Sequence, residues 1–411
     1  MNERRGIWEF AGELDRRKND KEGEIIVDMT RNLSVDYAGV RLRNPIILGS
    51  ATPGWDGKHL ADAEAAGVGA VVCKTIGPPA EWAAHPRNGR LAFVEVNGKR
   101  VGMVNLELFT TKTVEDWINY DLAVAKDSGA VVIASILALP SPAETGELAA
   151  WVEATGQVDL LELNVSCPMP ACSVGMHIGK DPTKTYAQVR AVKAATKLPL
   201  SVKMTPNIAD IGAVAVACRE AGADGLTVAN SVRSFAGVDI YTGLPRLRAF
   251  GGYSGPAIKP ITQRLVIEVK QACDLPVCAV GGITKWQDVV EYIMIGAQAV
   301  QVATGVMWQG WGIIGRLVDG LHRFMDEQGY SSLDDFRGLA LPYVTTVEQL
   351  AQEPKLVAEV DHERCTACGL CVGSCFYDAL ALDETLQVDT DRCDGCGLCV
   401  LLCPQRALSL E

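Results

Sequence analysis

The chain has 411 residues, of which 48% are hydrophobic, and a formal net charge of −12 at pH 7. This length suffices for more than one domain, and the acidic balance argues against a nucleic acid as partner, because phosphate binding needs a basic surface. The longest apolar stretch, Ala130–Leu139, is too short to span a bilayer. The first residues, MNERRGIWEF, lack the apolar core of a secretory signal, and most of the cysteines outside two cysteine-rich runs lie in apolar contexts typical of reduced thiols. We therefore expect a cytoplasmic protein.

The predicted elements begin after a charged segment, because residues 1–32 contain the run LDRRKNDKEGE and are expected to form an N-terminal extension. Residues 33–344 alternate short apolar runs, typical of buried strands, with amphipathic helical segments. The apolar runs are Pro45–Ser50, Ala70–Lys74, Ala130–Ile136, Leu160–Val165, Leu198–Met204, Gly225–Ala229, Leu275–Val280 and Ala299–Ala303. The helical patterns include Pro182–Thr196, Asp210–Ala221, Pro260–Ala272 and Trp286–Ile295. Strands that alternate with helices in this way predict a parallel (β/α)8 TIM barrel, with a doubly wound α/β sheet as the alternative.

Residues 345–360 are expected to be a linker to a ferredoxin-like domain over residues 361–411. This domain contains two C-x2-C-x2-C-x3-C runs, a spacing typical of [4Fe–4S] clusters, and in two-cluster ferredoxins the fourth cysteine of each run binds the other cluster. We therefore predict two [4Fe–4S] clusters. The expected ligand sets are Cys365, Cys368, Cys371 and Cys403 for one, and Cys393, Cys396, Cys399 and Cys375 for the other. A zinc ribbon is the alternative, although it usually has two separated C-x2-C pairs.

The C-terminal part of the chain is also acidic. From Lys355 onward there are ten acidic and four basic residues, which gives this part a charge of −6. Such a surface suits docking to a basic patch on a redox partner, and it equally suits simple solubility.

Polar residues follow the predicted strands, at the end of a barrel where enzymes of this fold carry their chemistry. Gly281-Gly282 and Ala303-Thr304 end the seventh and eighth strands, where backbone amides and a helix N-terminus can form a phosphate site. Lys74 and Lys203 end the second and fifth strands, and a lysine at such a position can stabilise negative charge on a reduced flavin ring. The segment Gly310–Gly315 matches G-x-G-x-x-G, but the βαβ unit of a dinucleotide site does not follow it.

Further polar side chains suit a ring-shaped substrate. Asn105, Glu107, Asn164 and Asn230 carry amide and carboxylate groups that can match the donors and acceptors of a flat heterocycle. Cys167 lies beside Ser166 in a proline-containing loop and is a candidate general acid or base. Cys172, in the same loop, is the rival candidate.

Several motifs together resemble those of the dihydroorotate dehydrogenase superfamily, and within it most closely the pyrimidine-reducing subunits of dihydropyrimidine dehydrogenases. The motifs are Asn105–Leu108, Glu162–Pro168, Lys203–Asn207, Ala229–Ser231, Tyr253–Pro260 and Val280–Ile283, followed by the two-cluster tail. Their order and combination are more specific than any one of them. The loop Met169–His177 is shorter than the family's mobile loop and differs from it in composition.

The resemblance implies an FMN over the barrel mouth, held by Ala51, Lys74, Thr75, Lys203, Gly255, Gly281, Gly282, Ala303 and Thr304. It also implies a pyrimidine held by Asn105, Glu107, Asn164, Ser166, Asn230 and Ser231, with Cys167 as its proton donor.

The activity that the resemblance implies is reduction of the 5,6 double bond of uracil or thymine. Electrons would arrive from a separate subunit that binds NAD(P)H and FAD and would pass through the clusters to FMN. A homodimer within a hetero-oligomer is expected from the same resemblance. Two alternatives stay open: a dihydroorotate dehydrogenase, or a reductase of another cyclic amide or enone-like ring, on the same fold, and a non-catalytic electron-transfer subunit.

Overall fold

The computed structural model describes residues 31–77, 89–167 and 175–411. The chain divides between Tyr343 and Val344 into two compact units. The N-terminal extension predicted over residues 1–32 lies outside the described residues except for its last two positions.

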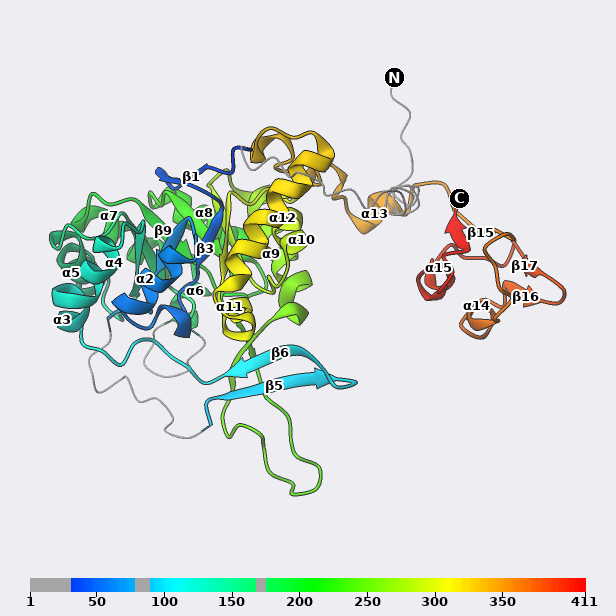
Figure 1. The fold of residues 1–411 in the computed structure, drawn as a ribbon, viewed down its shortest axis with the longest axis horizontal. Helices are drawn as coiled ribbons and strands as arrows, with labels where there is room; N and C mark the ends of the chain where they lie inside the picture. The colour runs from blue at the N-terminus through cyan, green and yellow to red at the C-terminus, as the bar shows by residue number, and fades with distance from the viewer. Residues whose placement is uncertain (1–30, 78–88, 168–174) are drawn as a thin grey trace. The chain divides into compact units, whose positions relative to one another are not determined.

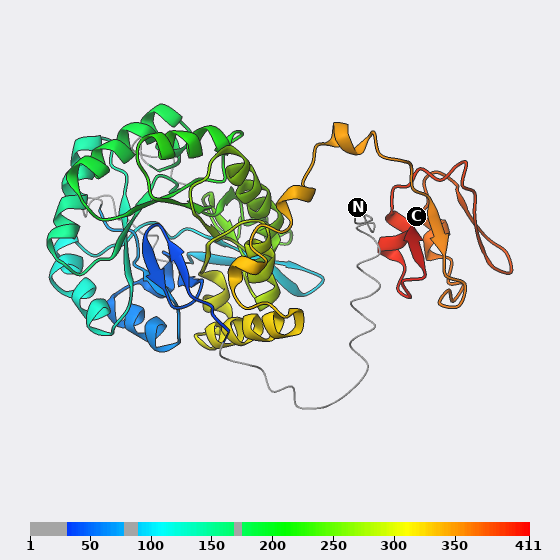
Figure 2. The same ribbon diagram turned by 90° about the horizontal axis from the view of Figure 1, so that it is seen from above.

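The larger unit is built on a closed barrel of parallel strands (Figures 1 and 2). Each strand pairs with the next barrel strand along the chain, and the last pairs with the first through Val300 and Ile46. The predicted (β/α)8 barrel is therefore confirmed, and each predicted apolar run contains one strand, except that β7 extends one residue beyond its run, to Leu137. The strands are β3 (Ile46–Leu48), β4 (Ala70–Val72), β7 (Val132–Leu137), β8 (Leu160–Asn164), β9 (Leu200–Lys203), β10 (Gly225–Val228), β13 (Val277–Val280) and β14 (Ala299–Val302).

Helices surround the barrel because each has one apolar face to bury against the strands (Figure 2). Several begin at an aspartate whose side chain accepts a hydrogen bond from the first turn, as Asp56, Asp181 and Asp210 do. The outer helices are α2 (Gly57–Ala65), α4 (Leu122–Asp127), α5 (Pro142–Ala154), α7 (Pro182–Ala195), α8 (Ile211–Glu220), α9 (Lys259–Ala272), α10 (Trp286–Met294) and α12 (Gly312–Gln328).

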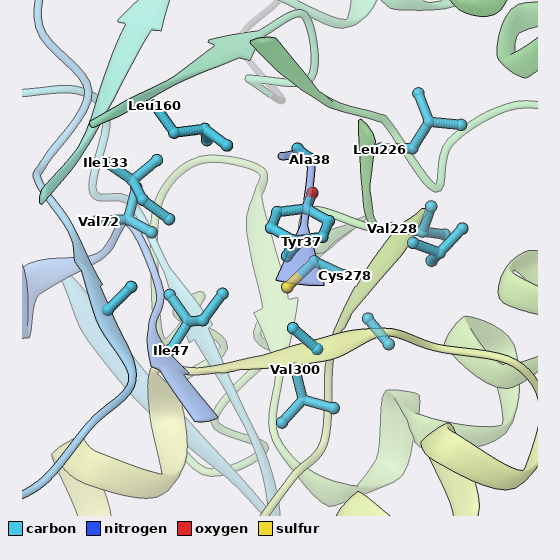
Figure 3. Close-up of a cluster of buried hydrophobic side chains, with 14 of the residues drawn as sticks. Tyr37, Ala38, Ile47, Val72, Ile133, Leu160, Leu226, Val228, Cys278 and Val300 are labelled. Carbon is cyan, nitrogen blue, oxygen red and sulfur yellow. The ribbon is translucent and has the colours of Figure 1, made fainter. Parts of the chain in front are cut away.

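A short hairpin of β1 (Val35–Tyr37) and β2 (Val40–Leu42) closes one end of the barrel. Gly225, the first residue of β10, leaves room for it, since a Cβ there would lie 3.1 Å from the Ala38 Cβ. The hairpin therefore covers the amino ends of the strands. Tyr37 is 1% exposed and lies among apolar side chains of the barrel interior (Figure 3).

The sequence pattern did not predict a second sheet, an antiparallel one in the order β11–β12–β6–β5. Its strands are β5 (Leu91–Val96), β6 (Lys99–Asn105), β11 (Val232–Ser234) and β12 (Gly251–Ser254), and the β5–β6 hairpin projects away from the barrel (Figure 1). Every residue of β5 is exposed or half-buried, although the strand begins with the apolar run Leu91–Val94, so an apolar run alone does not show that a strand belongs to the barrel. The remaining short elements of this unit are η1 (Thr52–Gly54), α3 (Val114–Asp116), η3 (Trp117–Asp121), α6 (Met176–Gly179), η4 (Pro256–Ile258), α11 (Thr304–Gln309), η5 (Leu333–Asp335) and η6 (Leu341–Tyr343).

The smaller unit has the duplicated pattern that its cysteine runs predict. Two antiparallel strand pairs pack with two short helices around a small apolar core that includes the cysteines; the pairs are β15 (Ala358–Val360) with β18 (Leu408–Leu410) and β16 (Leu380–Leu382) with β17 (Leu386–Val388). The strand β15 lies inside the segment predicted as a linker, so regular structure of this unit begins before residue 361. Its elements are α13 (Val347–Leu350), β15 (Ala358–Val360), α14 (Leu370–Gly373), β16 (Leu380–Leu382), β17 (Leu386–Val388), α15 (Leu398–Leu402) and β18 (Leu408–Leu410). No helix within the described ranges combines the length and the apolar character needed to cross a membrane.

Candidate active site and cluster sites

A cavity of roughly 1090 Å³, open mouth included, lies at the carboxyl ends of the barrel strands. Every residue that the resemblance assigns to FMN lines it: Ala51, Lys74, Thr75, Lys203, Gly255, Gly281, Gly282, Ala303 and Thr304. These residues come from distant parts of the chain, and the barrel brings them together because parallel strands end on one side. Their individual roles stay predictions.

The glycines beside β13 fit a phosphate-bearing cofactor. Gly281 and Gly282 have φ angles of +147° and +75°, a region that favours glycine. A Cβ on Gly281 would lie 2.5 Å from Thr262 Oγ1, and one on Gly282 would lie 2.7 Å from the Lys259 Cβ. Only glycine therefore fits at this turn. With Thr304 at the start of α11, the turn presents bare backbone to the cavity, and together with the two buried lysines this arrangement fits FMN.

The residues predicted to hold a pyrimidine also meet at this cavity, with one exception. Asn105, Glu107, Asn164, Asn230 and Ser231 line it.

Ser166 does not line the cavity; it is fully buried. Its hydroxyl donates to Asn164 Oδ1 at 2.8 Å and accepts from Asn230 Nδ2 at 2.9 Å. In this structure Ser166 therefore orients two amides that face the cavity.

Glu107 lines the cavity and pairs with two cationic side chains. Its carboxylate lies 3.5 Å from Lys74 Nζ and 3.7 Å from Arg90 Nη2, and it also accepts a hydrogen bond from the Thr52 hydroxyl. Burial lowers the pKa of Lys74 below its usual value, and the Glu107 charge opposes that shift. The positive charge of Lys74 and the negative charge of Glu107 therefore neutralise each other inside the cavity wall.

Cys167 faces the same cavity from the segment that follows β8. It is 5% exposed and packs with Phe109 and Leu137. The Met176 N–H donates to its carbonyl oxygen at 2.9 Å, and Gly175 lies directly against it. The rival candidate Cys172 and most of the shortened loop lie outside the described residues.

The structure adds lining residues that sequence reasoning missed, among them Thr52, Phe109 and Gln301. Thr52 follows the first barrel strand and is next to Ala51, which was predicted to hold the cofactor, so its position gave a hint of its role. Gln301 lies in the middle of an apolar strand run, where a polar side chain is a signal in itself.

In the smaller unit the cysteines gather around two further cavities. Cys365, Cys368, Cys371 and Cys403 line one, and Cys375, Cys393, Cys396 and Cys399 line the other. Each cavity therefore combines three cysteines of one run with the last cysteine of the other run, and four thiols around each space are a donor set that fits a [4Fe–4S] cluster.

Backbone N–H groups point at some of these sulfurs. The Ala379 N–H donates to Cys375 Sγ at 3.4 Å, and the Ala407 N–H donates to Cys403 Sγ at 3.2 Å. These two contacts occupy equivalent places in the repeat, and hydrogen bonds to cluster sulfurs raise reduction potentials.

Known proteins share both parts of this arrangement. Residues 32–325 match the family described as dihydroorotate dehydrogenase, and residues 358–381 and 386–409 each match the 4Fe-4S binding domain. The chain is 33% identical over 358 residues to the NAD-dependent dihydropyrimidine dehydrogenase subunit PreA of Escherichia coli K12, which covers 85% of this chain and 86% of the relative. It is 39% identical over 309 residues to the catalytic subunit of dihydroorotate dehydrogenase B (NAD(+)) from Methanothermobacter thermautotrophicus, which covers 75% of this chain and 98% of the relative.

A solved structure shares the fold. The crystal structure of DHODH from Eimeria tenella in complex with ferulenol superimposes with a TM-score of 0.64 at 19% identity, over 80% of this chain and 94% of that one. At this identity the likeness shows the fold alone. The family match and the identities above carry the assignment: this chain belongs to the dihydroorotate dehydrogenase family and is a flavin-dependent oxidoreductase with FMN and two [4Fe–4S] clusters.

Proposed function

We propose that this protein reduces the 5,6 double bond of uracil or thymine to the dihydropyrimidine, in the cytoplasm. The observation that carries this proposal is the ion pair of Lys74 and Glu107 in the cavity wall. Uracil and thymine are neutral rings that offer only amide-type donors and acceptors. Dihydroorotate carries an additional carboxylate, which needs an available cation.

The charges around Glu107 favour the neutral ring. Its carboxylate compensates Lys74, the most buried cation beside it, and each of these two side chains is only 6% exposed. A substrate carboxylate would have to displace Glu107 from Lys74 or lie close to it, and like charges at short range in a buried site repel strongly. The amides of Asn105, Asn164 and Asn230 then supply the donors and acceptors that a neutral ring requires.

In this proposal the residues divide into those that hold the cofactor and those that hold the ring. When bound, FMN supplies the step between single-electron clusters and a two-electron product. Cys167 donates the proton that completes the addition of hydrogen across the double bond, and its packing against Phe109 and Leu137 keeps the thiol at the cavity. FMN is held by Ala51, Lys74, Thr75, Lys203, Gly255, Gly281, Gly282, Ala303 and Thr304, and the ring by Asn105, Glu107, Asn164, Asn230 and Ser231, with Ser166 orienting the amides.

Electrons come, in this proposal, from a partner subunit that binds NAD(P)H and FAD. The Escherichia coli relative is named as a subunit of an NAD-dependent dehydrogenase, which supports a partner of this kind. The charge of −6 after residue 354 suits docking to a basic surface on that partner.

A second copy of the chain is the other proposed partner. The segment between β11 and β12 exposes large apolar side chains, with Ile240 84% and Tyr241 92% exposed. Exposed apolar groups of this size mark interaction surfaces. The homodimer is tested by sedimentation velocity of the intact protein and of an Ile240→Asp variant, which should shift the protein toward the monomer.

The test of the activity uses the purified, cluster-loaded protein without oxygen. The protein is reduced, and uracil, thymine, dihydrouracil and orotate are added separately while flavin absorbance is followed; dihydroorotate is added to the oxidised form. Reoxidation by uracil or thymine supports the proposal. Reoxidation by orotate alone, or flavin reduction by dihydroorotate, would instead support the activity for which the archaeal relatives are named.

A Cys167→Ala variant tests the proposed role of this thiol as proton donor. It should bind FMN and accept electrons normally, while the step with uracil slows by about 10²–10⁴-fold, the usual contribution of a general acid. Normal turnover in this variant would overturn the role of Cys167 and make Cys172 the candidate.

A further inference from the structure

A closed set of buried polar side chains holds the ammonium group of Lys203. Its Nζ donates to Glu162 Oε1 at 3.2 Å and to Gln301 Oε1 at 3.1 Å. Gln301 Nε2 donates in turn to Glu162 Oε2 at 2.5 Å, which closes a triangle of hydrogen bonds. The three side chains come from β9, β8 and β14, and none is more than 4% exposed. Lys203 and Gln301 line the cavity, whereas Glu162 lies behind them.

Glu162 is an unusual residue for its position. It lies in the middle of the strand Leu160–Asn164, where it is 1% exposed and flanked by leucines. A buried charge is retained only when it is paired and hydrogen-bonded. Thr227 Oγ1 also donates to Glu162 Oε2, at 3.0 Å, so three donors converge on a carboxylate that, when ionised, can only accept.

The set continues down the barrel interior toward the β1–β2 hairpin. Thr227 Oγ1 lies 3.0 Å from Ser201 Oγ, which lies 2.5 Å from Tyr37 Oη (Figure 3 shows Tyr37 in the barrel interior). At the other end of this set, near Lys203, the Gln301 side chain has little room to move, because a Cβ at Gly49 would lie only 3.3 Å from it. Lys203 is therefore held by a buried, hydrogen-bonded set of side chains with little free space around Gln301.

We propose that Glu162 is the positioning residue for Lys203 and the fixed countercharge that sets the reduction potential of the bound FMN. A lysine ammonium has three N–H donors, and Glu162 and Gln301 take two of them. The third is left for a group bound in the cavity. The proposal rests on the role of Lys203 in FMN binding proposed above, and it does not depend on which ring compound is the substrate.

The two charges act on the potential in opposite directions. Reduction adds negative charge to the bound cofactor, so the Lys203 ammonium makes reduction easier and the Glu162 carboxylate makes it harder. Glu162→Gln keeps the shape of the side chain and removes its charge, so the FMN potential should become more positive. Lys203→Met should make it more negative, and the double variant should return it toward the wild-type value.

The test is a reductive titration of the FMN potential in the cluster-loaded protein, with no substrate present. Tyr37→Phe is the matched control, since it removes a hydroxyl from the same set without changing a charge, and its potential should equal that of the wild type. A Glu162→Gln variant with an unchanged potential, or one that shifts in the same direction as Lys203→Met, overturns the proposal.

A second variant covers the case in which Glu162→Gln does not fold. Glu162→Asp keeps the charge and withdraws it by one methylene, so Lys203 loses its fixed position while the local charge stays the same. FMN should then bind about tenfold more weakly, as expected for the loss of one well-placed hydrogen bond to a charged group, with a smaller change in potential than in Lys203→Met. Wild-type FMN affinity in Glu162→Asp would contradict the positioning role. Failure of the uracil assay would leave both measurements interpretable, because neither contains a substrate.

Discussion

Lys74 Nζ and Glu107 Oε2 lie 3.5 Å apart in the wall of the main cavity, although the two residues follow different strands, β4 and β6. Burial of Lys74 is unfavourable by itself, and it lowers the pKa of this lysine. The carboxylate of Glu107 offsets that cost, and under the proposed function it also leaves Lys74 unavailable to a substrate carboxylate. Under that proposal, one ion pair connects the stability of the cavity wall with the choice of substrate.

Replacement of Glu107 by glutamine should shift the substrate preference from uracil toward orotate. Uracil reduction should fall by about 10–100-fold, the value of one hydrogen bond to a charged group, while orotate should begin to reoxidise the reduced protein. The alkaline limb of the pH profile should move to lower pH, because loss of the Glu107 charge lowers the pKa of Lys74 further and the lysine then loses its proton sooner. Steady-state kinetics with both rings from pH 6 to 10 measure all three effects.

Glu95→Gln is the control for this variant, since Glu95 is half exposed on the β5–β6 hairpin and pairs with Arg100. It should behave as the wild type. An unchanged substrate preference in Glu107→Gln would remove the basis for choosing uracil and thymine over orotate and dihydroorotate.

Gly175 should control the position of Cys167. Its φ angle is +60°, and a Cβ there would lie 2.3 Å from the Cys167 carbonyl oxygen, so Gly175→Ala must displace the cysteine or the loop. We expect activity to fall by up to about 100-fold, because small displacements of a reacting group are costly. Gly156→Ala is a matched control, with a φ of +66° and no atom within 4 Å of the added Cβ. It should lose only about 1–2 kcal/mol of unfolding free energy, as measured by urea denaturation, with normal activity.

The exchange of cysteines between the two cluster sites predicts how paired variants lose iron. Cys365→Ala combined with Cys403→Ala removes two ligands from the same predicted site, so one cluster of about four irons should remain per chain. Cys365→Ala combined with Cys375→Ala removes one ligand from each site and should disturb both clusters. Iron analysis and EPR spectra of the two double variants distinguish the arrangements. If each run held its own cluster, the two results would be reversed.

Cys73 should be unreactive in the folded protein. Burial raises the pKa of its thiol to about 12, so at pH 8 only about one molecule in 10⁴ carries the reactive thiolate. Alkylation by iodoacetamide, followed by mass spectrometry, should miss this residue at pH 8 and accelerate with rising pH. Unfolded protein should react at once. The same shift implies that unfolding free energy decreases between pH 9 and 12, because the unfolded chain releases this proton before the folded chain does.

Much of the cluster domain and of the barrel could be predicted from local sequence. The cysteine spacing indicates the clusters because ligand geometry requires short, regular intervals between cysteines, and the buried strands appear as apolar runs because both of their faces are covered. The candidate cofactor residues followed from the polar positions at strand ends and from the family resemblance, and the barrel brings them to one cavity. The sheet of β5, β6, β11 and β12 was not predicted, since its strands are short or solvent-facing and its two halves join only through β6 and β12, which are more than 100 residues apart in the sequence.

Which polar residues face the cavity and which support it was decided by the tertiary structure alone. Ser166 belongs to the same motif as Asn164 and Cys167, yet it lies behind them and orients two amides. Glu162 is a charged residue in a mostly apolar strand, and the sequence does not identify its partners. Only the closed barrel shows that Lys203 and Gln301 lie against it. The physical reason is that strand periodicity tells which side of a strand a residue occupies, whereas the partner of a buried charge depends on how separate strands are aligned in the closed barrel.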